Sequence, residues 1–83
     1  MSEYEIYVTQ EFERKFRTLT KRNKKLREAI LKIIDKLKEN SKFRKPLSHD
    51  LAGKWTIRVE RVYRIIYEID EENKRVVLMT IKH

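Results

Sequence analysis

Two arginines, Arg58 and Arg64, stand in stretches where polar and apolar residues alternate, a spacing that could place both guanidinium groups on one face of a sheet. Two planar guanidinium forks can bind consecutive phosphates and stabilise the extra negative charge of a phosphoryl-transfer transition state, without a metal ion. The alternative is that each arginine pairs with Glu60 or Glu68, the usual fate of a single surface arginine. The pattern by itself leaves both interpretations open.

The segments that carry these arginines are predicted to be strands. Apolar side chains occur there at every second position, which is the period of a half-buried strand. A polar turn at 70–74 leads to a last strand over Arg75–Lys82, and the short connections favour antiparallel pairing. The same alternation assigns Trp55 to the core and not to stacking on a base. The residues expected on the core side are Trp55, Ile57, Val59, Tyr63, Ile65, Tyr67 and Ile69.

The first half of the chain predicts the elements that cover this sheet. Tyr4–Val8 alternates like a short strand, and Thr9 is suited to cap a helix that continues to about Thr20. A second helix is expected from about Arg22 to Lys38. Its apolar stripe has the width that a sheet-covering helix needs, which favours core packing over a membrane-surface or coiled-coil role.

These elements predict an α+β fold, with the order βααβββ, an antiparallel sheet and the two N-terminal helices packed on one of its faces. At 83 residues the chain has room for one domain, 1–83. The side chains expected to be largely buried are those of Phe12, Phe16, Leu26, Ile30, Ile34, Leu37, Trp55, Ile57, Tyr63 and Ile65.

The composition favours a polyanionic partner. The chain carries 21 Lys and Arg against 13 Asp and Glu, a net charge of +8. Between Thr9 and Lys45 there are 14 basic and 5 acidic residues, so the excess is regional. Lysine-rich helices also serve simply to keep a small protein soluble, and charge alone does not separate the two uses.

Several classes of site are disfavoured by the residue types present. With no cysteine and only two histidines, far apart, we expect no disulfide, no metal site and no cofactor. No apolar run approaches the roughly 20 residues that cross a bilayer, and the N-terminus lacks a signal-peptide pattern. We therefore expect a cytoplasmic protein without a membrane partner.

The loop at 45–54 and the two predicted strands with Arg58 and Arg64 are similar in sequence to a known protein family. The run Lys45-Pro-Leu-Ser-His-Asp-Leu-Ala-Gly-Lys-Trp-Thr-Ile-Arg-Val59, followed by Tyr63-Arg-Ile-Ile-Tyr67, resembles the RelE/ParE toxin superfamily. Its Pro-Leu-x-His-x-Leu-x-Gly-x-Trp part is most similar to YoeB-type toxins, and the order of elements agrees over the whole chain. His49 within this run is expected to form loop hydrogen bonds and not to act as a catalyst.

The resemblance implies a toxin of a type II toxin–antitoxin system that cleaves messenger RNA in the decoding site of the ribosome. The ribose 2′-hydroxyl would attack the adjacent phosphate and leave a cyclic phosphate and a 5′-hydroxyl. By the same resemblance, Arg64 is the phosphate-binding arginine, Arg58 occupies a basic strand position, and His83 lies where a proton-transferring residue is expected. Four further residues are expected to bind RNA, namely Lys45, Lys54, Arg61 and Lys82.

The chain departs from the YoeB-type pattern at two positions. Lys45 stands where a carboxylate base would precede Pro46, and no Tyr follows His83. Either His83 or a lysine carries the proton in a reduced site, or the chain is a weakened toxin that retains antitoxin binding. A third interpretation is a ParE-like toxin that binds DNA gyrase without RNA chemistry. The paired Arg58 and Arg64 favour the nuclease.

The resemblance also implies partners. A chain this basic should be neutralised by a cognate acidic antitoxin that becomes ordered as it binds. The other partners implied are the ribosome and messenger RNA. The assemblies expected are a homodimer or a toxin–antitoxin heterotetramer.

Overall fold

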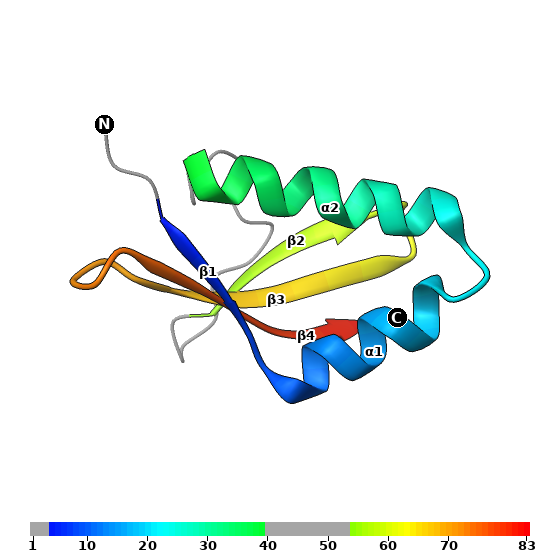
Figure 1. Cartoon of the computed structure of the whole chain (residues 1–83), viewed down its shortest axis with the longest axis horizontal. Coiled ribbons are helices and arrows are strands. Elements are labelled where there is room, and N and C mark those ends of the chain that lie inside the picture. Colours follow the sequence, from blue (N-terminus) through cyan, green and yellow to red (C-terminus); the bar gives the residue numbers. More distant parts are fainter. Residues whose placement is uncertain (1–3, 40–53) are drawn as a thin grey trace.

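The computed structural model describes residues 4–39 and 54–83, which form two helices and four strands (Figure 1). The predicted α+β class and the order βααβββ are confirmed. Three predicted loop residues of interest, Lys45, Pro46 and His49, lie outside the described residues. In chain order the elements are β1 (Glu5–Val8), α1 (Gln10–Thr20), α2 (Lys24–Glu39), β2 (Trp55–Val59), β3 (Tyr63–Asp70) and β4 (Arg75–Lys82).

The sheet has the strand order β1-β4-β3-β2. The pairs β2–β3 and β3–β4 are antiparallel, as their short connections predicted. β1, however, runs parallel to β4, so the sheet is mixed and the prediction of a wholly antiparallel sheet was wrong for β1. Two helices separate β1 from β2, and a connection of that length does not restrict strand direction as a hairpin turn does. Alternation predicted this strand but could not give its direction.

Short polar side chains fix where both helices begin. The Thr9 hydroxyl accepts a hydrogen bond from the Phe12 amide (3.0 Å), which caps α1, and donates one to the Met79 carbonyl (2.7 Å), which ties this helix end to β4. Asn23 Oδ1 accepts from the Leu26 amide (3.0 Å), so α2 begins at Lys24, slightly later than predicted. Neither helix is long and apolar enough to span a membrane, a statement limited to the described part of the chain.

The core lies between the two helices and one face of the sheet. Of the ten side chains expected inside, six are buried and the other four, Phe16, Ile34, Trp55 and Tyr63, are partly buried and pack against them. Val8 at the end of β1 is exposed although it shares the parity of Ile6. The buried apolar residues are Phe12, Leu26, Ile30, Leu37, Ile57, Val59, Ile65, Tyr67, Val76, Leu78 and Ile81.

A bulge in β4 decides which of its last side chains face the helices. Ile66 is opposite Thr80 but Tyr67 is opposite Leu78, so Met79 is an extra residue in the ladder. One extra residue moves all later side chains to the other face. Ile81 therefore joins the core, and Lys82 comes to lie on the face that α1 and α2 leave open.

Candidate functional site

Three basic residues form a row across neighbouring strands on this open face of the sheet. Arg58 is directly opposite Arg64, and Arg64 is directly opposite Lys82. All three are exposed, and within residues 4–39 and 54–83 none of them forms an ion pair. We call Arg58, Arg64 and Lys82 the cationic row.

The two carboxylates that might have neutralised the arginines are engaged elsewhere. Glu60 lies 3.8 Å from the ammonium of Lys25 on α2, and Glu68 lies 2.7 Å from that of Lys54. The alternative that Arg58 and Arg64 merely pair with these glutamates therefore does not hold. Like charges directly opposite each other on neighbouring strands destabilise a sheet, so the cationic row is a place where a bound anion would be stabilised.

A hollow of about 440 Å³ adjoins the row on the open face. Its floor is the next cross-strand row, Thr56, Ile66 and Thr80, and Lys54 and Lys82 border it. Glu11, in the first turn of α1, reaches its edge. Hydroxyl, ammonium and carboxylate groups thus surround one space beside the row.

Glu11 is held in its charged form. The nearby Thr80 hydroxyl, together with the positive charge of Lys15 3.6 Å away, places the pKa of Glu11 below its usual value. The Thr80 hydroxyl is itself buried without a regular hydrogen bond among the described residues, so it acts on Glu11 as a nearby dipole and not through a formed bond. Glu11 is therefore an ionised carboxylate at neutral pH, although its lowered pKa makes it a weaker proton acceptor than an ordinary glutamate. Glu11 could not be singled out from the sequence, because a glutamate in a first helical turn is ordinarily explained by the helix dipole.

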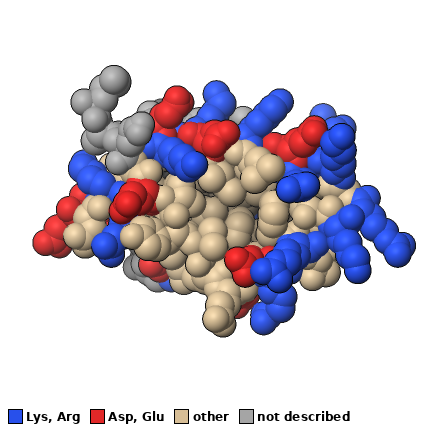
Figure 2. All heavy atoms as spheres, in the orientation of Figure 1, with Lys and Arg blue, Asp and Glu red and all other residues tan. Residues whose placement is uncertain are grey.

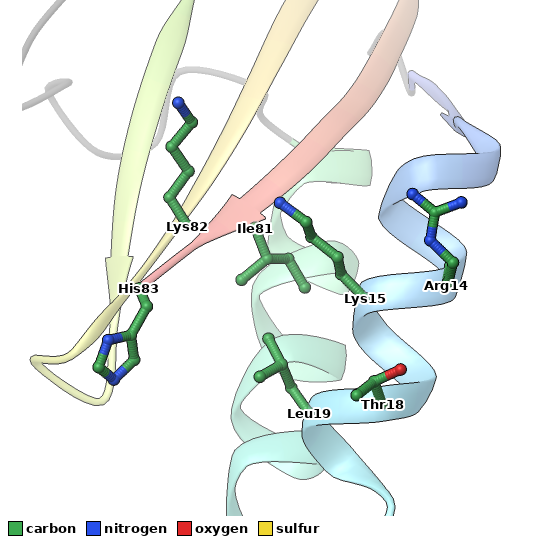
Figure 3. A pocket seen from close by; sticks show the side chains of 7 residues that line it. All are labelled: Arg14, Lys15, Thr18, Leu19, Ile81, Lys82 and His83. Carbon is green, nitrogen blue, oxygen red and sulfur yellow. The ribbon is translucent and has the colours of Figure 1, made fainter.

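The structure separates His83 from the two arginines. Its ring meets Tyr63 edge-on with the ring centroids 5.2 Å apart, and Tyr63 packs against the core on the helix side of the sheet. In Figure 3, His83 and Lys82 leave the end of β4 in different directions, and both line a cleft against α1. The site thus joins Arg58, Arg64 and Lys82 in one row, with His83 beyond its end.

The other residues expected to bind RNA differ in their surroundings. Lys54 borders the hollow while pairing with Glu68, whereas Arg61 is exposed in the β2–β3 turn. Glu60 and Arg61 have φ angles of 52° and 66°, in the left-handed region that favours glycine. Arg58 also lines a second hollow, at the sheet edge, with Lys32 and Lys36 of α2. Basic side chains thus flank both ends of the cationic row.

Charge is unevenly spread on the face shown in Figure 2. Lys and Arg side chains gather at the right, where α1 and its turn to α2 lie in Figure 1, while an area without charged side chains occupies the middle. A groove between the helices contains the apolar side chains of Val8, Phe12, Phe16, Leu31 and Ile34.

Comparison with known proteins gives consistent matches over nearly the whole chain. Residues 6–83 match the family described as the ParE toxin of the type II toxin–antitoxin system parDE. A protein of Methanocaldococcus jannaschii named as the putative toxin RelE4 is 29% identical over 80 residues, which is 96% of this chain and 85% of the relative.

Two solved structures show the same arrangement of elements. The YoeB/ParE toxin from Agrobacterium tumefaciens superposes with a TM-score of 0.79 at 18% identity, covering 94% of this chain and 95% of that one. The toxin chain matched in the RelBE2 toxin–antitoxin complex from Mycobacterium tuberculosis gives a TM-score of 0.74 at 26% identity, covering 98% of both chains.

Proposed function

The chain belongs to the RelE/ParE superfamily of toxins from type II toxin–antitoxin systems, and from this we propose that it is a ribosome-dependent endoribonuclease that cleaves messenger RNA in the cytoplasm. The observation that carries the proposal is the cationic row. Its three side chains lie opposite one another at a cost in stability and have no carboxylate partner in the described part of the chain. A phosphodiester supplies the missing negative charge.

The reaction that fits this face is an internal transfer of the phosphoryl group. The 2′-hydroxyl oxygen bonds to the adjacent phosphorus, the bond from phosphorus to the 5′ oxygen breaks, and a 2′,3′-cyclic phosphate and a 5′-hydroxyl result. Arg58 and Arg64 hold the non-bridging oxygens, on which charge accumulates in the transition state. Lys82 extends the positive field to the flanking backbone, and Lys54 borders the hollow while paired with Glu68.

Two proton transfers complete the reaction. Glu11 is our candidate acceptor of the 2′-hydroxyl proton, because it is ionised and borders the hollow beside the row. It replaces the carboxylate whose usual position is occupied by Lys45. His83 is the candidate that protonates the leaving 5′ oxygen, since it lies just beyond Lys82 at the end of β4.

We also propose an acidic antitoxin as the regulating partner. The net charge of +8 favours an acidic chain, and the groove between α1 and α2 offers apolar side chains beside the Arg17–Glu13 ion pair. The partner should become ordered on this surface. Co-purification with the protein encoded by a neighbouring reading frame should yield a stoichiometric complex whose affinity falls as salt rises; an affinity independent of salt would count against the electrostatic contribution.

The proposed function is tested by adding purified protein to ribosomes programmed with a defined message and mapping the message ends by primer extension. Cleavage inside the decoding site, giving cyclic phosphate ends, is expected. The competing function is the gyrase inhibition expected of a ParE-like toxin, and a ParE toxin is what the description of the matching family names, so a supercoiling assay runs in parallel. An intact message together with inhibited gyrase would replace the nuclease by a ParE-like activity, and inactivity in both assays would indicate a chain that only binds an antitoxin.

A further inference from the structure

A second basic hollow lies at the end of β4, against the outer surface of α1 (Figure 3). This cleft is open to solvent and has a volume of about 550 Å³. Helix α1 supplies Arg14, Lys15, Thr18 and Leu19, and β4 supplies Ile81, Lys82 and His83. Leu19 is partly buried and packs against the core, of which Ile81 is a buried member, so these two residues close the cleft on its apolar side.

The rim of the cleft is positive and only partly neutralised. Lys15 pairs at 3.6 Å with Glu11, in a geometry where both side chains remain substantially exposed. Arg14 and Lys82 form no ion pair within the ranges that the structure describes. Two unpaired cations beside an apolar floor suit a ligand that combines an anion with a flat apolar group.

A nucleotide combines these two features. Its phosphate can bind Arg14 and Lys82, and its base can stack on the exposed His83 ring with Leu19 beside it, since bases stack on aromatic side chains without regard to sequence. Thr18 adds a hydroxyl that can donate to or accept from a base edge. A lipid head group or a bare phosphate would leave the apolar floor unused.

The cleft is continuous with the cationic row. Lys82 borders both the cleft and the hollow beside Arg64. β1 pairs with β4 only as far as Leu78, so among residues 4–39 and 54–83 no strand flanks the last four residues of β4 on that side, and the open face extends toward α1 there. An RNA strand whose phosphate lies on the row can therefore pass over Lys82 into the cleft.

We propose that this cleft binds the nucleotide that follows the scissile phosphate, and so holds the leaving group of the cleavage reaction. The inference rests on the proposed function for the order of nucleotides, but the cleft itself is defined independently of it. His83 then lines the subsite in which the 5′ oxygen is released, which accounts for its position beyond the row.

The test is a titration of the ¹⁵N-labelled full chain with adenosine 3′-monophosphate, which carries the 5′-hydroxyl of the leaving group and the phosphate that follows it, and, separately, with inorganic phosphate. The nucleotide should shift amide signals of residues 14–19 and 81–83 and bind roughly 10-fold more tightly than phosphate, because the base adds stacking. Arg14→Ala should weaken nucleotide binding by about 10-fold or more. The matched control is Arg17→Ala, on the same helix but paired with Glu13 at 2.8 Å and lining the other groove, where a change of less than about 2-fold is expected.

Several outcomes would overturn the inference. These are equal affinities for nucleotide and phosphate, shifts confined to residues 58 and 64, or equal effects of the two arginine substitutions. The titration uses no ribosome, so it separates the inference from the proposed function. If the protein cleaves the message on programmed ribosomes but binds no nucleotide in the cleft, only the proposed subsite is rejected. If the cleft binds the nucleotide but the message stays intact, the proposed nuclease function is rejected and the nucleotide site remains.

Discussion

The two faces of the sheet show opposite uses of one register. On the covered face, Ile65 of β3 lies between Ile57 and Ile81, and all three are buried. One residue earlier, on the open face, Arg64 lies between Arg58 and Lys82. The pairing that aligns three apolar side chains in the core also aligns three cations in solvent. The first row stabilises the fold, whereas the like charges of the second oppose it, as expected if the second row binds the anion that we propose.

The largest effect on stability should come from the covered face. Ile65→Ala removes a fully buried side chain at the centre of the apolar row, so the free energy of unfolding should fall by about 2–5 kcal/mol. Urea unfolding measures this loss. The cleavage rate per folded molecule should stay unchanged. A loss of rate in fully folded Ile65→Ala would contradict the separation of the two faces.

A pH titration should sharpen the comparison through Tyr67, which is also fully buried on the covered face. Burial raises the pKa of Tyr67 to about 12, so the folded state holds the proton more tightly than the unfolded chain, where tyrosine titrates near 10. Protonated Tyr67 makes its full contribution to the free energy of unfolding below pH 10. This contribution, on the order of 2 kcal/mol, is lost as the pH rises from about 10 to 12. The free energy of unfolding of Tyr67→Phe, measured by urea unfolding at several pH values, should fall less over this interval than that of the wild type. An equal decline would mean that Tyr67 ionises in place.

Neutralising the cationic row should raise stability. Arg64→Gln removes the charge that lies between Arg58 and Lys82, and with it two repulsive contacts. The free energy of unfolding should rise by up to about 1 kcal/mol at low salt. The gain should shrink as salt screens the remaining charges. Arg75→Gln on β4 serves as the control, because the residue opposite Arg75 is Asp70. If Arg64→Gln lowered the free energy of unfolding, the cationic row would stabilise the fold, contrary to the repulsion expected between its like charges.

The smallest effect on stability is expected in the turn between β2 and β3, the two strands that contribute to both rows. Arg61 has a φ of 66°, which costs less for glycine than for a residue with a Cβ atom. Arg61→Gly should therefore stabilise the protein by roughly 0.5 kcal/mol, seen as a slightly higher thermal midpoint. Arg75→Gly, within a strand, should lower it. A lower midpoint for Arg61→Gly would show that its side chain supports the turn.

Much of the fold could be predicted from the sequence because its periods are clear. Alternation around Trp55 and Tyr63 predicted β2 and β3, their faces and the placement of Arg58 and Arg64 on one face of neighbouring strands. The direction of β1 could not be predicted, since no short turn constrains it. Antiparallel pairing was therefore assigned to the whole sheet, although it holds for three of the four strands.

The site was less predictable than the fold. Lys82 was named as an RNA-binding residue, but simple alternation from Val76 and Leu78 would have turned it toward the core; the bulge at Met79 places it beside Arg64. Glu11 and Thr80 come together only through the contact of α1 with β4, which no local pattern encodes. Long-range placement of this kind is what the sequence could not supply.

The most direct test of the account is the rate at which Arg64→Ala cleaves the message on programmed ribosomes, compared with the wild type in a single turnover. If Arg64 holds transition-state charge, the rate should fall by about 100-fold or more while urea unfolding shows a fold at least as stable. Arg75→Ala, at the far end of β4 with its cation 5.1 Å from the Tyr7 ring, should stay within about 2-fold of the wild-type rate. A folded Arg64→Ala protein that cleaves at the wild-type rate would contradict the account.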